Sequence, residues 1–297
     1  LFKMYARGTE PAALPVVFIL GAPRSGSTLL YQVMINVFDF FYFSNLVNDH
    51  FPEHPAIGAA LDQILNPRKP VAYLSDHGKT EGPYGPSEAS LIFRYWFGGE
   101  HPSQTHSARA LSDKSEHLRL TMQSIYGISN RPILAKNAWN CFRIKTLVEL
   151  FPAIQFVWIR RDIVQGAWSD LKARYVRGGP TVWNSATTAN YREIQQMPYW
   201  EQVIEQQYAY CQSVAHDLAN YAPGRFWEIW YEDVCWNPTA EINRLREHWL
   251  DSRFKVNTRG ESPPMFALSE GQSGESDDLA KICDYVARQA ERFRDCR

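Results

Sequence analysis

The sequence predicts an α/β fold of the P-loop type, with a parallel β-sheet flanked by helices on both faces. Strand-like and helical segments alternate along the chain, which is typical of parallel sheets. The strand-like segments are continuous apolar runs, as expected for strands buried on both faces. The first of them leads through a glycine-containing loop into a helix. With 297 residues the chain is long enough for one large domain, and we expect a single domain over residues 1–297.

The first unit is a strand, a loop and a helix. Residues 15–21 (PVVFILG) are an apolar run that ends in glycine, and residues 26–38 (GSTLLYQVMINVF) carry apolar side chains at helical spacing. Ser and Thr at the start of the second run favour a helix N-terminus there. We therefore predict a loop at the carboxyl end of a buried strand.

A long irregular insertion is expected at residues 39–131. Prolines interrupt its pattern repeatedly, and the only helix that we expect in it lies around residues 86–97. Segments of this length without regular structure are uncommon in compact domains and are usually functional or form a lid.

Regular elements return after this insertion. Residues 131–136 (RPILAK) and 153–161 (AIQFVWIRR) are predicted strands, with a helix from about 141 to 150 between them and another helix at about 163–175. Residues 176–191 contain the breakers Gly-Gly-Pro and are predicted to form a loop. The remaining elements are a helix over 199–221, a strand over 224–233, a helix over 237–250 that is capped by Asn237 with Pro238 at its first position, and a final helix over about 277–294.

Composition narrows the function classes. The formal net charge is −1 and the pI is about 6.8, so no chain-wide basic field favours nucleic-acid or membrane-surface binding. Five scattered cysteines without C-x-x-C spacing indicate reduced thiols, and we expect a cytoplasmic location. The longest early apolar run, residues 14–22, is too short to span a bilayer. The chain does not begin with methionine, so an anchor upstream of it stays open.

No metal site is predicted. His101 and His106 lie five residues apart and have no third ligand nearby, so we interpret their spacing as chance.

The loop after the first strand has the frame of a phosphate-binding loop without its lysine. Gly21 and Gly26 are five residues apart, as in GxxxxGK[ST], but Ser27 stands in the lysine position and Thr28 in the final hydroxyl position. Loop amides and the helix N-terminus are suited to an anionic group. Arg24 within the loop adds a planar set of donors for a tetrahedral oxyanion. The missing lysine weakens the case for magnesium-assisted triphosphate chemistry.

The motif APRSGSTLL resembles the 5′-phosphosulfate loop of the sulfotransferases that use 3′-phosphoadenosine 5′-phosphosulfate (PAPS). A second signature of that family, an arginine at a strand end followed eight residues later by a helical serine, is matched by Arg161 and Ser169 in RDIVQGAWS. The resemblance implies that these two residues hold the 3′-phosphate. The cofactor-binding residues that it implies are Arg24, Ser25, Gly26, Ser27, Thr28, Arg161 and Ser169.

The resemblance extends over about half of the chain. The segment ILAKNAWNCFRIKTLVELFPAIQFVWIRRD is similar to the family stretch in which a strand ends in lysine, here Lys136, and WYEDVCWNP resembles its Tyr-Glu-Asp segment. It implies transfer of a sulfonate group from PAPS to a hydroxyl acceptor by in-line displacement, with Lys136 or Arg24 assisting the leaving oxygen. The insertion over 39–131 would then form the acceptor side. No metal is implied.

The general base is not fixed by the resemblance. The segment YLSDHGKTEGPYGPSEAS is similar to a stretch of bacterial members of the family and contains His77 and Glu88, our leading candidates, with His50 third. A solvated loop explains the same segment equally well.

Two further segments stay open. Residues 176–198 are interpreted either as a lid over the acceptor, with Trp183 and Tyr191 as apolar walls, or as a surface loop with one anchoring tryptophan. The Arg-Lys-Gly segment that closes over the nucleotide in cytosolic members of the family has no clear counterpart around Arg259 and Gly260.

Two other functions remain as alternatives. One is a P-loop nucleotide kinase or hydrolase with an atypical loop, and the other is a non-catalytic binding protein of the same fold. The near-neutral, aromatic-rich chain hints at a small-molecule or lipid-like hydroxyl acceptor, and nothing in the sequence predicts an oligomeric state.

Overall fold

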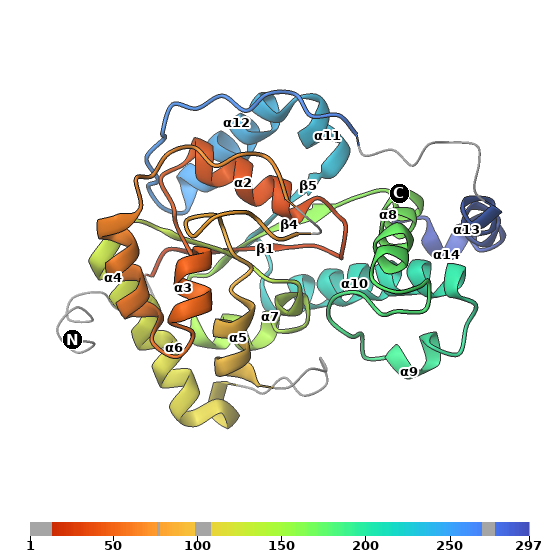
Figure 1. Ribbon diagram of the computed structural model, residues 1–297, viewed down its shortest axis with the longest axis horizontal. Coiled ribbons are helices and arrows are strands. Elements are labelled where there is room, and N and C mark those ends of the chain that lie inside the picture. Colours follow the sequence, from red (N-terminus) through yellow and green to blue (C-terminus); the bar gives the residue numbers. More distant parts are fainter. Residues whose placement is uncertain (1–13, 76–77, 99–107, 269–276, 297) are drawn as a thin grey trace.

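The computed structural model describes residues 14–75, 78–98, 108–268 and 277–296. At its centre lies a five-stranded parallel sheet in the order β2-β3-β1-β4-β5, so the predicted fold class is confirmed (Figure 1). The strands are β1 (Val16–Leu20), β2 (Phe41–Tyr42), β3 (Ile133–Lys136), β4 (Gln155–Arg160) and β5 (Phe226–Trp230).

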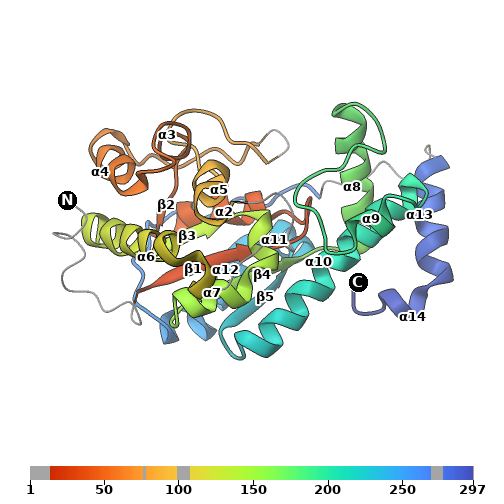
Figure 2. The ribbon, with the colours of Figure 1, turned by 90° about the horizontal axis from the view of Figure 1, so that it is seen from below.

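Helices surround this sheet (Figures 1 and 2). In chain order they are α2 (Ser27–Val37), α3 (Asn45–His50), α4 (Pro55–Leu65), α5 (Ser90–Phe97), α6 (Ala108–Ser129), the 3-10 turn η3 (Ala138–Phe142), α7 (Ile144–Leu150), α8 (Ile163–Val176), α9 (Tyr191–Ile194), α10 (Tyr199–Tyr221), α11 (Tyr231–Trp236), α12 (Pro238–His248), the 3-10 turn η4 (Leu250–Ser252), α13 (Asp277–Arg288) and α14 (Ala290–Phe293).

Alternate residues of the central strand β1 enter two different cores. Phe18 packs in the cluster that includes buried residues of α5, α6, α7 and α10. Ile19 packs in the cluster that includes buried residues of α2, α11 and α12. This two-sided burial explains why β1 is apolar at every position instead of at every second one. A third cluster joins α8, α10 and α13 at one end of the molecule (Figure 2).

The strand order brings three loops to one edge of the sheet. In the parallel register Ile19 of β1 pairs with Lys136 of β3, and Leu20 pairs with Trp158 of β4. The carboxyl ends of β3, β1 and β4 therefore lie side by side, which is where ligands bind in open parallel sheets.

Several predicted elements match the structure closely. The helix predicted over 199–221 is α10 with the same bounds, and the one predicted over 163–175 is α8. Asn237 caps α12 as predicted, because its Oδ1 accepts a hydrogen bond from the backbone N–H of Ala240 at 3.2 Å.

The insertion is more regular than expected. Residues 39–131 contain β2, α3, α4, α5 and all of α6 as well as loops. Pro55, which we interpreted as a breaker, occupies the first turn of α4, where its missing N–H costs no hydrogen bond. The helix expected around 86–97 begins only at Ser90.

Three other boundaries differ from the predictions. The strand expected over 224–233 ends at Trp230, and α11 begins at the next residue. The helix expected from 141 starts as η3, and the final helix is divided into α13 and α14 at Gln289. Among the described residues, none of the helices has the length and apolar character needed to cross a membrane.

Candidate functional site

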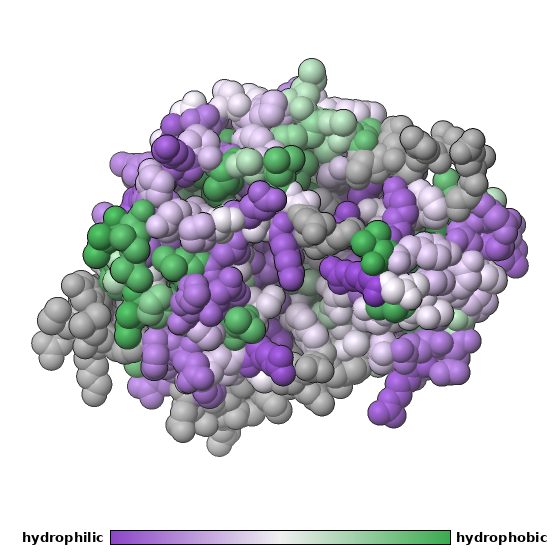
Figure 3. Space-filling model, in the orientation of Figure 1, coloured by the Kyte–Doolittle hydropathy of each residue, from purple (hydrophilic) through white to green (hydrophobic). Residues whose placement is uncertain are grey.

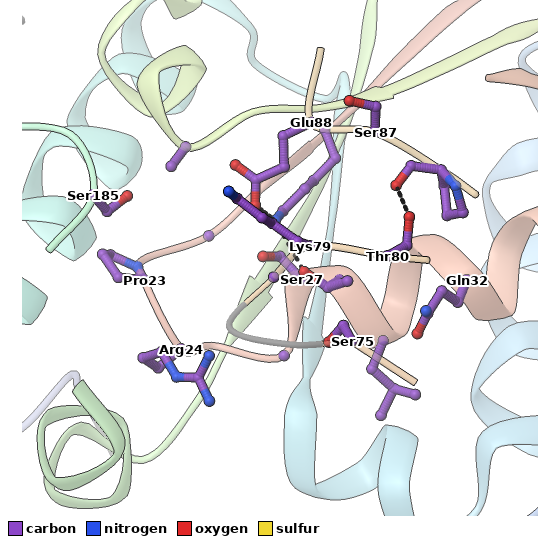
Figure 4. Close-up of a pocket in the computed structure, with 18 of the residues that line it drawn as sticks. Pro23, Arg24, Ser27, Gln32, Ser75, Lys79, Thr80, Ser87, Glu88 and Ser185 are labelled. Atoms are coloured by element: carbon purple, nitrogen blue, oxygen red, sulfur yellow. Dashed lines mark hydrogen bonds and ion pairs between the residues drawn. The ribbon is translucent and has the colours of Figure 1, made fainter. Parts of the chain in front are cut away.

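A cavity of about 980 Å³ opens at the carboxyl edge of the sheet. Its lining comes from the loop after β1, the end of β3, the segment that precedes α5, the loop after α8 and the start of α11. Figure 4 shows Arg24 and Ser185 on one side of Ser27, Gln32 and Ser75 on the other, and Glu88 and Lys79 reaching toward the space above it.

The loop between β1 and α2 has the backbone of an anion-binding turn. Arg24 and Gly26 have left-handed φ values of 66° and 85°. Gly26 is required for a second reason, since a Cβ there would overlap the ring of Tyr231. Ser27 then begins α2, so that the helix N-terminus faces the cavity, a position where a helix attracts anions.

Side chains from three other elements hold this loop from behind. Gln207 of α10 donates to the carbonyl of Pro23 at 2.9 Å, and Nη1 of Arg161 donates to the carbonyl of Arg24 at 2.8 Å. The Cys141 thiol accepts from the N–H of Gly21 at 3.3 Å. Burial raises the pKa of the Cys141 thiol to about 12, so it stays protonated at neutral pH. Because the carbonyls of Pro23 and Arg24 accept hydrogen bonds from Gln207 and Arg161, they are held away from the side on which a ligand would bind.

The predicted arginine–serine pair lies next to the loop. Nε of Arg24 donates to Oγ of Ser169 at 3.1 Å, so Arg24 contacts Ser169 through its side chain and Arg161 through its main-chain carbonyl. The Arg161 guanidinium lies 4.4 Å from the ring centroid of Tyr231. Burial lowers the pKa of Arg161, which means that the charged form would gain from an anion bound beside it.

The predicted cradle residues divide between two cavities. Arg24, Gly26, Ser27, Thr28 and Arg161 line the large cavity. Ser25 instead lines a cavity of about 30 Å³ behind the loop, and its buried Oγ has no hydrogen-bond partner within the described part of the chain. Ser169 is 6% exposed and reaches the site through its contact with Arg24.

A lysine from a neighbouring strand stands beside the loop. Nζ of Lys136, at the end of β3, donates to Oγ1 of Thr28 at 3.0 Å and forms an ion pair with Oε1 of Glu88. Gly78 lies against this pair, since a Cβ there would stand 3.2 Å from Oε1 of Glu88. The ammonium that the loop sequence lacks is therefore supplied from β3.

The three candidate bases have different positions. Glu88 lines the cavity, and its side chain is 32% exposed. His50 lies at the exposed end of α3 and is not among the lining residues. His77 lies outside the described residues.

The loop after α8 is pinned to the core. The fully buried Asp170 and Arg174 form an ion pair at 3.0 Å, and Asp170 accepts from Nδ2 of Asn184 at 2.6 Å. Gln206 donates to the carbonyl of Asn184 at 2.7 Å. Over 177–186 these contacts favour a fixed wall over a mobile lid, while the role of residues 176–198 stays a prediction. Trp183 packs edge-on against Tyr191, with centroids 4.6 Å apart.

An aromatic pair, not predicted from the sequence, lines the far end of the cavity. The rings of Tyr73 and Phe266 meet edge-on with centroids 5.0 Å apart, and both line the cavity. The C-terminal segment that carries Phe266 is tied down where the N–H of Phe266 donates to the carbonyl of Cys235 at 3.0 Å. This segment follows Arg259 and Gly260, where the sequence has no clear counterpart of the family's Arg-Lys-Gly segment.

Sequence reasoning also missed Gln207 and Cys141 as loop supports. A signal for Gln207 was present, because it is a polar residue at helical spacing among the apolar residues Val203, Ile204, Tyr210 and Val214 of α10. Cys141 carried no such signal. Among the described residues, no cluster of three or more metal-ligating side chains occurs.

A model of the sulfotransferase family matches residues 15–251. Omega-hydroxy-beta-dihydromenaquinone-9 sulfotransferase Stf3 of Mycobacterium bovis and that of Mycobacterium tuberculosis are each 25% identical to this chain over 130 residues. That match covers 43% of this chain and only 31% of those relatives.

Two solved structures share the fold. Sulfotransferase STF9 from Mycobacterium avium has a TM-score of 0.52 at 15% identity, covering 93% of this chain and 68% of that one. Sulfotransferase STF1 from Mycobacterium tuberculosis H37Rv also has a TM-score of 0.52 at 15% identity, covering 98% of this chain and 80% of that one. At this identity the likeness concerns the fold alone. With the family match over residues 15–251, the comparisons show that the chain belongs to the sulfotransferase family.

Proposed function

We propose that this protein transfers a sulfonate group from PAPS to a hydroxyl group of an acceptor. The observation that carries the proposal is that Arg24 of the loop contacts both Arg161 and Ser169, while Lys136 and Glu88 form an ion pair in the same cavity. A nucleotide with two separated anionic groups needs two sets of donors, and the loop with Lys136 on one hand and Arg161 with Ser169 on the other support this assignment.

The residues present fit such a donor. Amides of the loop and the N-terminus of α2 would hold the phosphosulfate, and Arg161 with Ser169 would hold the 3′-phosphate. The Ser169 hydroxyl accepts from Arg24, which leaves its own O–H free to donate to a phosphate oxygen. The aromatic pair Tyr73 and Phe266 offers apolar surface for a nucleobase. When bound, the donor supplies an activated sulfonate.

The chain's own residues provide the rest of the chemistry. As the oxygen of the acceptor hydroxyl bonds to sulfur, Glu88 accepts the proton of that hydroxyl. Lys136 and Arg24 stabilise the negative charge on the phosphate oxygen that leaves as the S–O bond breaks. Lys136 has three N–H donors, so it can contact Thr28, Glu88 and this oxygen together.

The position of Lys136 favours this reaction over nucleotide kinase chemistry. In P-loop kinases and hydrolases the hydroxyl that ends the motif helps to hold magnesium. Here that hydroxyl, on Thr28, accepts from the Lys136 ammonium, and the adjacent strand β4 ends in Arg160 followed by Arg161. The presence of Glu88 in the cavity also counts against a non-catalytic binding protein.

Calorimetry tests the donor assignment directly. We expect 3′,5′-adenosine bisphosphate to bind at least tenfold more tightly than AMP, without magnesium. Equal affinities for the two nucleotides, or tighter binding of magnesium-ATP, would contradict the proposal. Transfer of labelled sulfonate from PAPS to a hydroxyl acceptor tests the reaction itself.

A further inference from the structure

The walls of the cavity beyond Glu88 indicate what kind of acceptor enters it. Six of the residues that line the cavity belong neither to the loop after β1 nor to the aromatic pair, and we call them the acceptor wall: Asp49, Ser90, Leu91, Trp139, Arg177 and Ser185. Five of these six side chains carry hydrogen-bonding or charged groups, including the indole N–H of Trp139, and Leu91 is the aliphatic one. In the orientation of Figure 1, hydrophilic side chains also predominate over the middle of the surface, between α3 and α8 (Figure 3).

One side of the acceptor wall is braced by a buried asparagine. Asn48 is 7% exposed, its Oδ1 accepts from the N–H of Leu91 at 3.0 Å, and its Nδ2 donates to Oδ1 of Asp49 at 2.7 Å. This contact fixes the first turn of α5, which carries Ser90, against the end of α3, which carries Asp49. A carboxylate held in place at a cavity mouth is suited to accept hydrogen bonds from a ligand.

The aromatic member of the wall is tied to the candidate base. Asn137 is 2% exposed, its Nδ2 donates to the carbonyl of Glu88 at 3.0 Å, and its Oδ1 accepts from the N–H of Trp139 at 3.0 Å. The buried Arg143 lies 5.5 Å from the Trp139 ring centroid and supports that ring. Asn137 therefore connects the backbone of Trp139 to the backbone of Glu88.

The opposite side is equally rigid. The ion pair of Asp170 with Arg174 holds Asn184, whose Oδ1 accepts from Nη1 of Arg177. Ser185 follows with a left-handed φ of 72°, a strained conformation for a residue with a side chain. Rigid polar groups of this kind add to specificity because an apolar ligand would strip them of water without replacing its hydrogen bonds.

We propose that the acceptor is a polyhydroxylated compound, such as a sugar or glycoside, and not a long-chain alcohol. This inference rests on the proposed function. The Trp139 ring offers a surface for the C–H face of a sugar ring, while Asp49, Ser90, Arg177 and Ser185 match its hydroxyl groups. It departs both from the lipid-like acceptor suggested by the composition and from the omega-hydroxy-beta-dihydromenaquinone-9 named for the Stf3 relatives.

A matched acceptor panel tests the inference. The protein is incubated with labelled PAPS and either methyl glycosides of glucose, galactose and N-acetylglucosamine or 1-octanol, 1-dodecanol and a simple phenol. We expect sulfonate on at least one glycoside, with kcat/KM at least tenfold above that of every alcohol and phenol. Preference for an alcohol or phenol, or no transfer to any glycoside, overturns the inference.

Binding of 3′,5′-adenosine bisphosphate, measured on the same sample, separates this inference from the proposed function. If the bisphosphate binds more tightly than AMP and only an alcohol is sulfonated, the acceptor class is wrong and the proposed function stands. If the bisphosphate shows no preference over AMP, the proposed function fails and the inference fails with it.

Variants of the wall give a second measurement on the glycoside that is sulfonated best. Trp139→Ala is expected to raise the KM for the glycoside at least tenfold, and Trp139→Phe to restore most of the lost affinity. Asp49→Asn, at an exposed position, is expected to raise this KM about threefold to tenfold. Trp236→Ala is the matched control, since Trp236 is 65% exposed and does not line the cavity, and it is expected to change KM less than twofold. Equal or larger losses from Trp236→Ala than from Trp139→Ala would overturn the inference.

Discussion

Nη1 of Arg161 donates a hydrogen bond to the main-chain carbonyl of Arg24 at 2.8 Å, across 137 positions of sequence. The residue that we assign to the 3′-phosphate thus also helps to shape the loop that we assign to the 5′ end. This hydrogen bond therefore connects the two halves of the proposed donor site.

Replacing Arg161 tests this connection. Arg161→Ala is expected to weaken binding of 3′,5′-adenosine bisphosphate by about 2 to 4 kcal/mol, because a buried charge-assisted contact is lost. AMP affinity is expected to fall much less, and calorimetry with both nucleotides gives the comparison. Arg160→Ala is the matched control, since Arg160 pairs with Glu228 at 2.9 Å and does not line the large cavity. If both variants lose the same affinity for both nucleotides, the 3′-phosphate assignment is wrong.

Replacing Glu88 tests its assignment as the general base. Glu88→Gln is expected to lower kcat about 10²- to 10⁴-fold, because an amide cannot accept the acceptor proton. Affinity for the bisphosphate is expected to stay within about threefold, as in a loss confined to the chemical step. Glu81→Gln serves as the control, since Glu81 belongs to the same segment, is exposed and does not line the cavity. An unchanged kcat in the Glu88→Gln variant would contradict the assignment of Glu88 as the general base.

Gln207 is expected to act on donor binding through the loop. Gln207→Leu leaves the carbonyl of Pro23 without its side-chain donor, so the loop relaxes and bisphosphate affinity falls about fivefold to tenfold. The KM for PAPS is expected to rise more than kcat falls, and Gln207→His, which retains an N–H donor, to recover part of the loss.

A matched glutamine separates this effect from simple destabilisation. Gln155 is also buried and donates to a carbonyl, that of Ala153, at 2.9 Å, but it lies at the opposite end of its strand from the site. Gln155→Leu is expected to lower stability in urea while leaving nucleotide affinity unchanged. Equal effects of the two substitutions on affinity would argue against a positioning role for Gln207.

Cys141 gives a pH-dependent prediction. Burial raises its folded-state pKa from 9.0 to about 12, so above pH 9 the unfolded chain loses a proton that the native protein keeps. The native state then binds more protons, and the free energy of unfolding falls as pH rises, by up to about 1.4 kcal/mol per pH unit for one group. Urea unfolding at pH 8, 9 and 10 is expected to show a decline that is smaller in Cys141→Ala. If the free energy of unfolding declines by the same amount with pH in both proteins, this explanation is wrong.

Local patterns in the sequence were sufficient for the elements around the donor site. β1, the loop and α2 could be predicted because glycine spacing and apolar runs act over short stretches. Arg161 and Ser169 were identified differently, from the resemblance to a family signature in which an arginine at a strand end is followed eight residues later by a helical serine. The roles of these residues in binding remain predictions.

Contacts over long sequence separations could not be predicted in the same way. Lys136 lies 108 positions from Thr28 and 48 from Glu88, and only the order of the strands brings the three together. Gln207 meets Pro23 across 184 positions. The long helix α6 was missed because its mean character is polar, although Leu118, Met122 and Ile125 form a buried stripe at helical spacing.

The order of the strands has a consequence for how this protein can change. The loop, Arg161 and Ser169 depend on β1 and β4 in the interior of the sheet, whereas Asp49, Glu88 and Ser90 come from one continuous stretch that leaves and rejoins the sheet at its β2–β3 edge. Substitutions in that stretch that keep Tyr73 can therefore change this part of the cavity while the loop, Arg161 and Ser169 stay as they are. A graft of this single segment between related proteins is thus a direct route to a new choice of substrate, provided that the pairing of Glu88 with Lys136 is preserved.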